Sequence, residues 1–211
     1  MPSLKSATLY GILDLSYIAL SEIQPVAQAM IAGGIDIVQL RAKQLPVDQF
    51  AEIALQLAPV FRDVGIPFIL NDHPELVATT GVTGAHVGQD DVSVAEARRL
   101  AGPDAVIGKS THSIAQAVAG GAEADYIGFG PIFATPTKPD YPAIGLADIR
   151  AAHESTATPI FCIGGVKLEN LDLVISAGAR RVVIVSGLLQ APDLAEYARQ
   201  VRRILSVGQQ S

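Results

Sequence analysis

The stretch IVQLRAK, residues 37–43, decides the fold, because an apolar run here ends in polar residues that alternate along the chain. Gln39, Arg41 and Lys43 are each two positions apart, so an extended strand would place all three on one face. Two cations on the inward face of a buried strand are costly unless an anion meets them. The stretch therefore predicts a buried strand whose carboxyl end opens on an anion-binding site.

The same pattern of a short apolar run followed by an amphipathic segment repeats along the chain. The runs that predict strands are 9–15, 36–41, 67–71, 85–89, 105–109, 125–130, 159–163 and 181–186. Eight strands, each followed by a helix, predict an α/β fold: a single-domain (β/α)8 TIM barrel over residues 1–211. A doubly wound open sheet is the structural rival, and the repeated polar residues at strand ends favour the barrel.

The composition limits the classes of function. The chain has 211 residues, 49% of them hydrophobic and 17% charged, which suits one core with strands buried on both faces. A net charge of −6 argues against a general nucleic-acid partner. No apolar run approaches the roughly 20 residues that cross a bilayer, so we expect a cytoplasmic protein without a membrane partner, with a homo-oligomer as an option.

The lone cysteine, Cys162, lies inside the apolar run 159–163. A single cysteine excludes an internal disulfide and a multi-cysteine zinc site. We interpret it as a small buried hydrophobic residue rather than as a nucleophile, since no base is marked near it in the sequence.

Carboxylates follow two neighbouring predicted strands. Asn71 and Asp72 end the third strand, and Asp90 and Asp91 follow the fourth. Turn chemistry explains the first pair taken alone, and the start of a helix explains the second. Together they place hard oxygen ligands beside the cations of the second strand, which suits Mg²⁺ with a bound phosphate.

Small residues end the last two predicted strands. Gly164 and Gly165 follow the seventh strand, and Ser186 and Gly187 follow the eighth. Glycines there let backbone N–H groups approach an anion. The loops after strands seven and eight recurrently bind phosphate in this fold, so we predict a second anion site at the same mouth.

Hydroxyl groups and one more cation complete the predicted mouth. Ser110 ends the fifth strand as a hydroxyl donor. Thr135, Thr137 and Lys138 lie in residues 131–145, a segment too long for an ordinary βα connection, so a ligand-binding loop and a proline-rich surface loop both fit it. Two anion sites at one mouth imply two phosphorylated ligands, or one ligand with phosphates at both ends.

Seven segments, in order, resemble the thiamine-phosphate synthase family: QLRAK, ND, HVGQDD, GKSTH, YIGFGPIFATPTK, IGG and VSG. The likeness runs from the second strand to the last, and the motif over residues 129–138 is the most specific. It implies a magnesium-dependent transferase that joins an aminopyrimidine methyl pyrophosphate to thiazole phosphate, or to its carboxylate. The products would be thiamine phosphate and pyrophosphate, formed through a pyrimidine-stabilised carbocation.

The resemblance also implies roles for the predicted residues. The pyrimidine pyrophosphate would be bound by Gln39, Arg41, Lys43, Asn71 and Lys138. Asp72 and Asp91 would hold Mg²⁺. Ser110 would contact the departing pyrophosphate or the pyrimidine ring, and with Arg41 and Lys138 it forms the implied catalytic set. The thiazole moiety would face Thr135 and Thr137, and its phosphate would be held by Gly165, Val185 and Ser186.

Two alternatives belong to other classes of function. A thiazole tautomerase shares the barrel and the phosphate pocket, and His112 resembles the histidine that it uses for proton transfer. A catalytically silent barrel would bind thiamine precursors without turnover. The presence of Asp72, Asp91 and Lys138 favours the synthase over both.

Overall fold

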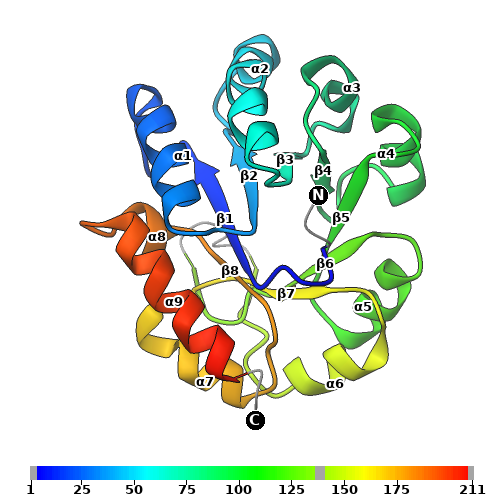
Figure 1. Ribbon diagram of the computed structural model, residues 1–211. Helices are drawn as coiled ribbons and strands as arrows, with labels where there is room; N and C mark the ends of the chain where they lie inside the picture. The colour runs from blue at the N-terminus through cyan, green and yellow to red at the C-terminus, as the bar shows by residue number, and fades with distance from the viewer. Residues whose placement is uncertain (1–3, 136–140, 209–211) are drawn as a thin grey trace.

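The computed structural model describes residues 4–135 and 141–208, and its strands close into one parallel barrel (Figure 1). The strands are β1 (Leu9–Asp14), β2 (Ile37–Arg41), β3 (Phe68–Asn71), β4 (Gly84–Val87), β5 (Val106–Thr111), β6 (Tyr126–Phe129), β7 (Ile160–Cys162) and β8 (Val182–Ile184). Each pairs with the next along the chain, and β8 pairs with β1. The predicted (β/α)8 barrel is confirmed, and closure excludes the open sheet.

Helices surround the ring of strands (Figure 1). The α-helices are α1 (Ile23–Ala32), α2 (Val47–Asp63), α3 (Val77–Thr80), α4 (Val94–Ala101), α5 (Ile114–Gly121), α6 (Ile149–Ser155), α7 (Leu171–Ser176), α8 (Ser186–Leu189) and α9 (Leu194–Gly208). Short 3-10 turns precede three of them: η1 (Leu20–Glu22), η2 (Pro74–Leu76) and η3 (Leu168–Asn170). In the described part of the chain, no helix is both long enough and apolar enough to cross a bilayer.

The last strand is shorter than the sequence pattern predicts. The apolar run suggested a strand over 181–186, but β8 ends at Ile184 and a short helix begins at Ser186. Val185, with φ −112° and ψ −86°, turns the chain between them. This turn brings the start of α8 to the barrel mouth.

Alternation along each strand divides the core into two layers. Tyr10, Ile12 and Phe161 belong to the cluster inside the barrel. Leu9 and Leu13 belong to the larger cluster between the strands and the helices. The inner layer lies inside the barrel, directly beneath the polar residues of the mouth.

Cys162 lies fully buried in the outer layer. Burial raises the pKa of its thiol to about 12. Its Sγ lies 3.9 Å from Nε2 of His153, and burial, reinforced by nearby arginines, lowers the pKa of that imidazole to about 4. Both groups are therefore neutral at pH 7, which agrees with Cys162 as a buried apolar residue.

Asp36 stabilises the base of the barrel, the side where the amino ends of the strands lie. One oxygen of its carboxylate accepts hydrogen bonds from the backbone N–H groups of Thr8 (2.8 Å) and Leu9 (2.9 Å). The other oxygen accepts from Nη1 of Arg202 in α9, at 2.7 Å. The carboxylate thus joins β1, β2 and the last helix.

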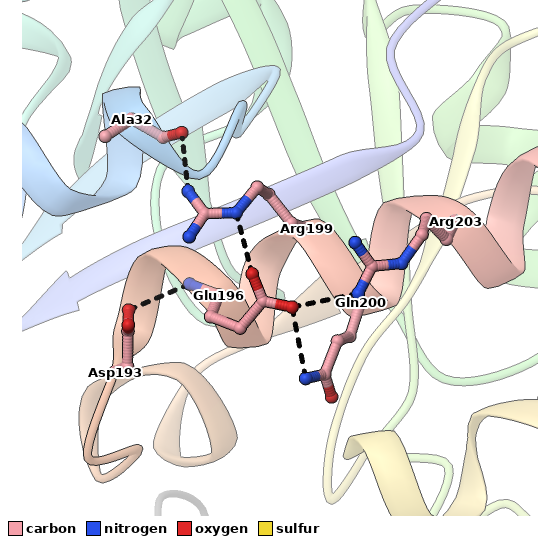
Figure 2. Close-up of polar contacts among 6 residues, drawn as sticks. All are labelled: Ala32, Asp193, Glu196, Arg199, Gln200 and Arg203. Carbon is pink, nitrogen blue, oxygen red and sulfur yellow. Dashed lines mark hydrogen bonds and ion pairs between the residues drawn. The ribbon is translucent and has the colours of Figure 1, made fainter.

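Exposed polar contacts fix α9 further. Figure 2 shows Glu196 accepting hydrogen bonds from Arg199, Gln200 and Arg203 along the same helix. Arg199 also donates to the Ala32 carbonyl at the end of α1, at 3.3 Å. The Glu196 contacts stabilise α9 itself, and the Arg199–Ala32 hydrogen bond joins α9 to α1 on the outer surface of the barrel.

Candidate active site

A cavity opens at the carboxyl ends of the strands, where the fold places active sites. The predicted site residues that line it are Gln39, Arg41, Asn71, Ser110, Thr135, Gly165, Val185 and Ser186. They come from strands or loops around most of the barrel, so the closed ring brings together residues far apart in the sequence.

Lys43 lies outside the cavity wall, contrary to the shared face predicted for it with Gln39 and Arg41. The strand β2 ends at Arg41, so strand alternation no longer governs a residue two positions further on. The Lys43 side chain is half exposed, and its Nζ lies 3.4 Å from Oδ2 of Asp72. The cation therefore stands at the rim, beside a predicted metal ligand.

Asp72 and Asp91 face each other at this rim. Burial is the largest cause that raises the pKa of the Asp72 carboxyl, and the Asp91 charge is the next. Lys43 acts in the opposite direction. Asp72 also has φ 64°, the single left-handed value outside glycine among the described residues. Strained backbone of this kind gathers at functional sites.

The two carboxylates fit Mg²⁺. A cation between them would relieve the repulsion that raises the pKa of Asp72. Mg²⁺ commonly takes one or two carboxylates and fills its other positions with water and phosphate. No group of three or more His, Cys, Asp or Glu side chains that could hold a metal ion occurs in residues 4–135 and 141–208. Asp91 is held by the Gly88 N–H, which donates to its Oδ2 at 2.6 Å.

Arg41 has an internal partner that the sequence analysis missed. Its Nη1 lies 2.6 Å from Oδ2 of Asp14, which is nearly fully buried at the end of β1. The Asp14 carboxylate therefore supplies part of the negative charge that we expected beside Arg41, in addition to any bound ligand. Parallel pairing of β1 with β2 sets Asp14 beside Arg41, and the polar end of the first predicted strand was the available signal.

The glycine loop after β7 is shaped by its neighbours. Gly164 and Gly165 both have positive φ, at 96° and 66°. A Cβ at Gly165 would lie 2.7 Å from Cβ of Phe133, so the loop after β6 occupies the space that a side chain would need. The glycines are thus required by backbone conformation and close packing, in addition to the predicted approach of an anion.

Part of the long loop lies outside the described residues, including Thr137 and Lys138. Thr135, before this segment, lines the cavity. Tyr141, after it, donates to Oδ2 of Asp90 at 3.0 Å, and its ring centroid lies 4.6 Å from that of His112. His112 also lines the cavity and is hydrogen-bonded through Nδ1 to the Gly130 carbonyl oxygen.

Three further polar side chains in the cavity wall were missed by sequence reasoning: Tyr10, His86 and Tyr126. Each stands inside an apolar run, on β1, β4 and β6 respectively. Tyr10 and Tyr126 are fully or nearly fully buried. Their inward positions could have been read from strand alternation, but their contact with each other depends on closure of the ring.

The thiamine monophosphate synthase family model matches residues 9–188. The chain belongs to this family. It is 44% identical over 178 residues to the thiamine-phosphate synthase of Thermus thermophilus, covering 83% of this chain and 85% of that one. With the thiamine-phosphate synthase of Azorhizobium caulinodans it shares 38% identity over 210 residues, 99% of each chain.

A solved structure agrees with this assignment. Thiamine phosphate pyrophosphorylase from Pyrococcus furiosus superposes with a TM-score of 0.87 at 26% identity, covering 97% of this chain and 98% of that one. The chain is therefore a transferase of the thiamine-phosphate synthase type.

Proposed function

We propose that this enzyme joins 4-amino-2-methyl-5-pyrimidinylmethyl pyrophosphate to thiazole phosphate, or to its carboxylate, and releases thiamine phosphate and pyrophosphate. The relatives' shared name supports the product. The polar groups of the site support two phosphorylated substrates.

The observation that carries the proposal is a single cavity with polar groups on opposite sides. Asn71 ends β3, and Gly165 follows β7, four strands away in a ring of eight. Strands four apart in such a ring lie across the barrel from each other. Both residues line the same cavity, together with Arg41 on β2, the neighbour of β3, and Ser186 after β8, the neighbour of β7. One ligand phosphate on each side would leave the reacting atoms between them.

In the proposed reaction, the bond between the pyrimidine methylene carbon and the pyrophosphate oxygen breaks first. The oxygen keeps the electron pair, and the amino-substituted ring delocalises the positive charge on the carbon. The lone pair of the thiazole nitrogen then forms the new C–N bond. No proton is transferred in these steps, and the carboxylated substrate would in addition lose CO2.

Charge around the leaving group would then account for most of the catalysis. Arg41 and Lys43 lie on the side of the mouth that we assign to pyrophosphate, and Lys138 is predicted to join them. Asp72 and Asp91 would hold Mg²⁺, which supplies positive charge to the departing oxygens when bound. Ser110, on the cavity wall, would hydrogen-bond the pyrimidine or the pyrophosphate.

The test is a coupled assay for pyrophosphate with the purified protein. We expect release only when both substrates and Mg²⁺ are present, and omission of any one should reduce it to background. Absence of release with authentic substrates and metal would overturn the proposal. Turnover of the thiazole carboxylate phosphate alone, without metal and unaffected by Asp91→Ala, would instead identify a tautomerase acting through His112.

A further inference from the structure

Five polar side chains inside the barrel form one continuous series of hydrogen bonds, which we call the buried polar chain. In order, they are Gln39, Tyr10, Tyr126, His86 and Ser110. The successive donor–acceptor distances are 2.8, 3.0, 3.1 and 2.9 Å. All five residues line the cavity, so the two ends of the chain, Gln39 and Ser110, both border the space that is open to a ligand.

The chain has a direction. Nε2 of Gln39 donates to the Tyr10 hydroxyl oxygen. Burial raises the pKa of both tyrosines above the ordinary value, so each stays a neutral phenol with one hydrogen to donate. If Tyr126 donated to Tyr10, the Tyr10 oxygen would accept twice, and its own hydrogen would lack an acceptor among the described residues. A buried hydroxyl left without a partner is unfavourable.

The remaining roles follow in sequence. With that direction, Tyr10 would donate to Tyr126, and Tyr126 would donate to Nδ1 of His86. A neutral imidazole would then carry its hydrogen on Nε2 and donate it to Oγ of Ser110. Since that oxygen accepts from His86, the Ser110 hydroxyl hydrogen remains for a ligand. At the other end, the Gln39 amide nitrogen is turned to Tyr10, so the amide oxygen remains for a ligand.

The surrounding backbone makes room for this chain. A Cβ at Gly108 would lie 2.1 Å from the Tyr126 ring and 2.5 Å from Nδ1 of His86. A side chain at this position of β5 would therefore separate the tyrosine from the histidine. Packing inside the barrel thus favours the contact that joins the two halves of the chain.

We propose that the buried polar chain selects heteroaromatic rings with a donor beside an acceptor, because it fixes Gln39 as an acceptor and Ser110 as a donor. An aminopyrimidine has this edge in its amino group and adjacent ring nitrogen. The oxo analogue has the opposite edge, a carbonyl beside a ring N–H. To bind it, the Gln39 amide and every hydrogen bond of the chain would have to reverse together.

Tyr10, Tyr126 and His86 are in this account positioning residues, which act through Gln39 and Ser110. The inference rests on the proposed function, since it takes the pyrimidine to be the ring in the cavity. It goes beyond that function by assigning the choice between amino and oxo rings to side chains that need not touch the ligand.

The experiment compares the amino pyrophosphate substrate with its oxo analogue, by kcat/KM and, without turnover, by calorimetry of the two pyrimidine alcohols. Wild type should prefer the amino form by about 100-fold or more. Tyr126→Phe interrupts the chain with little change of shape, so the preference should fall at least tenfold while KM for thiazole phosphate stays constant. Thr80→Val, which removes a buried hydroxyl in α3, is the matched control and should keep the preference.

A second pair of variants guards against a folding defect. His86→Gln can keep a donor near the Nε2 position, whereas His86→Asn is too short to reach Ser110. We expect the Gln variant to retain more of the amino preference than the Asn variant. Equal losses for both rings in Tyr126→Phe, or equal preferences in both His86 variants, would overturn the inference. Absence of pyrophosphate release by wild type would instead refute the proposed function.

Discussion

The base and the mouth of the barrel both hold partly buried aspartates, but these differ in what surrounds them. Asp36 at the base and Asp72 at the mouth have similar side-chain exposure, 20% and 26%. Asp36 accepts two backbone hydrogen bonds and pairs closely with Arg202. Asp72 has a left-handed backbone, and its pKa is raised by burial and by the nearby Asp91 carboxylate. Its cationic partner, Lys43, lies at the longer distance of 3.4 Å. The base satisfies its charge permanently, whereas the mouth leaves charge for a ligand.

The largest effect is expected from Asp91→Ala, which should reduce kcat/KM by about 100-fold or more. Without this carboxylate, the site would hold Mg²⁺ poorly, and the departing pyrophosphate would lose the positive charge of the metal. The variant removes no core volume, so circular dichroism and Tm should resemble those of wild type. Steady-state kinetics at saturating Mg²⁺ would measure the loss. An unfolded variant would show that Asp91 acts as a structural residue like Asp36.

The converse change is Asp36→Ala, at the base. It leaves the backbone N–H groups of Thr8 and Leu9 without their acceptor and removes the ion pair with Arg202, which keeps the Gly34 carbonyl oxygen, so the free energy of unfolding should fall by about 2–3 kcal/mol. Urea denaturation would measure this, and kcat per folded molecule should be unchanged. A selective loss of Mg²⁺ dependence without loss of stability would break the distinction between the two ends.

Ser186→Asp tests the other side of the mouth. A carboxylate at the start of α8 should repel the thiazole phosphate and raise its KM about tenfold or more, with little effect on KM for the pyrimidine substrate. The two KM values, measured in the same assay, decide this. Equal increases would mean that the two anion sites are assigned to the wrong sides.

The smallest effect concerns stability at the mouth. Asp72→Asn removes the repulsion with Asp91 and suits the left-handed backbone, so it should raise the free energy of unfolding by about 0.5–1 kcal/mol. Because the folded-state pKa of Asp72 is raised, its contribution to stability is present below the unfolded pKa and is lost as the pH rises through the folded pKa. The Tm advantage of the variant should therefore grow from about pH 4 towards neutral pH. An advantage that shrinks over this interval would contradict the account.

The sequence predicted the fold well because strand periodicity and polar strand ends are local signals. The apolar run before Asn71, for example, directly gave β3 and its polar end. The pairing of Asp14 with Arg41 was not predicted, since it needs the register between β1 and β2. Tyr10 and Tyr126 are 116 positions apart, and nothing local indicates that their hydroxyls meet.

At the end of the chain, local signals were misleading. The apolar residues before Ser186 suggested a longer strand, whereas α8 begins at that residue. The roles assigned to Lys138 and Thr137 stay predictions, because these residues lie outside the described segments.

The most direct measurement is calorimetric titration of Mg²⁺ into the protein in the presence of pyrophosphate. Wild type and folded Asp36→Ala should bind Mg²⁺ with the same affinity, and Asp91→Ala should lose at least tenfold. Equal Mg²⁺ affinity in all three proteins would contradict the claim that the mouth aspartates, and not those of the base, are placed to hold the metal.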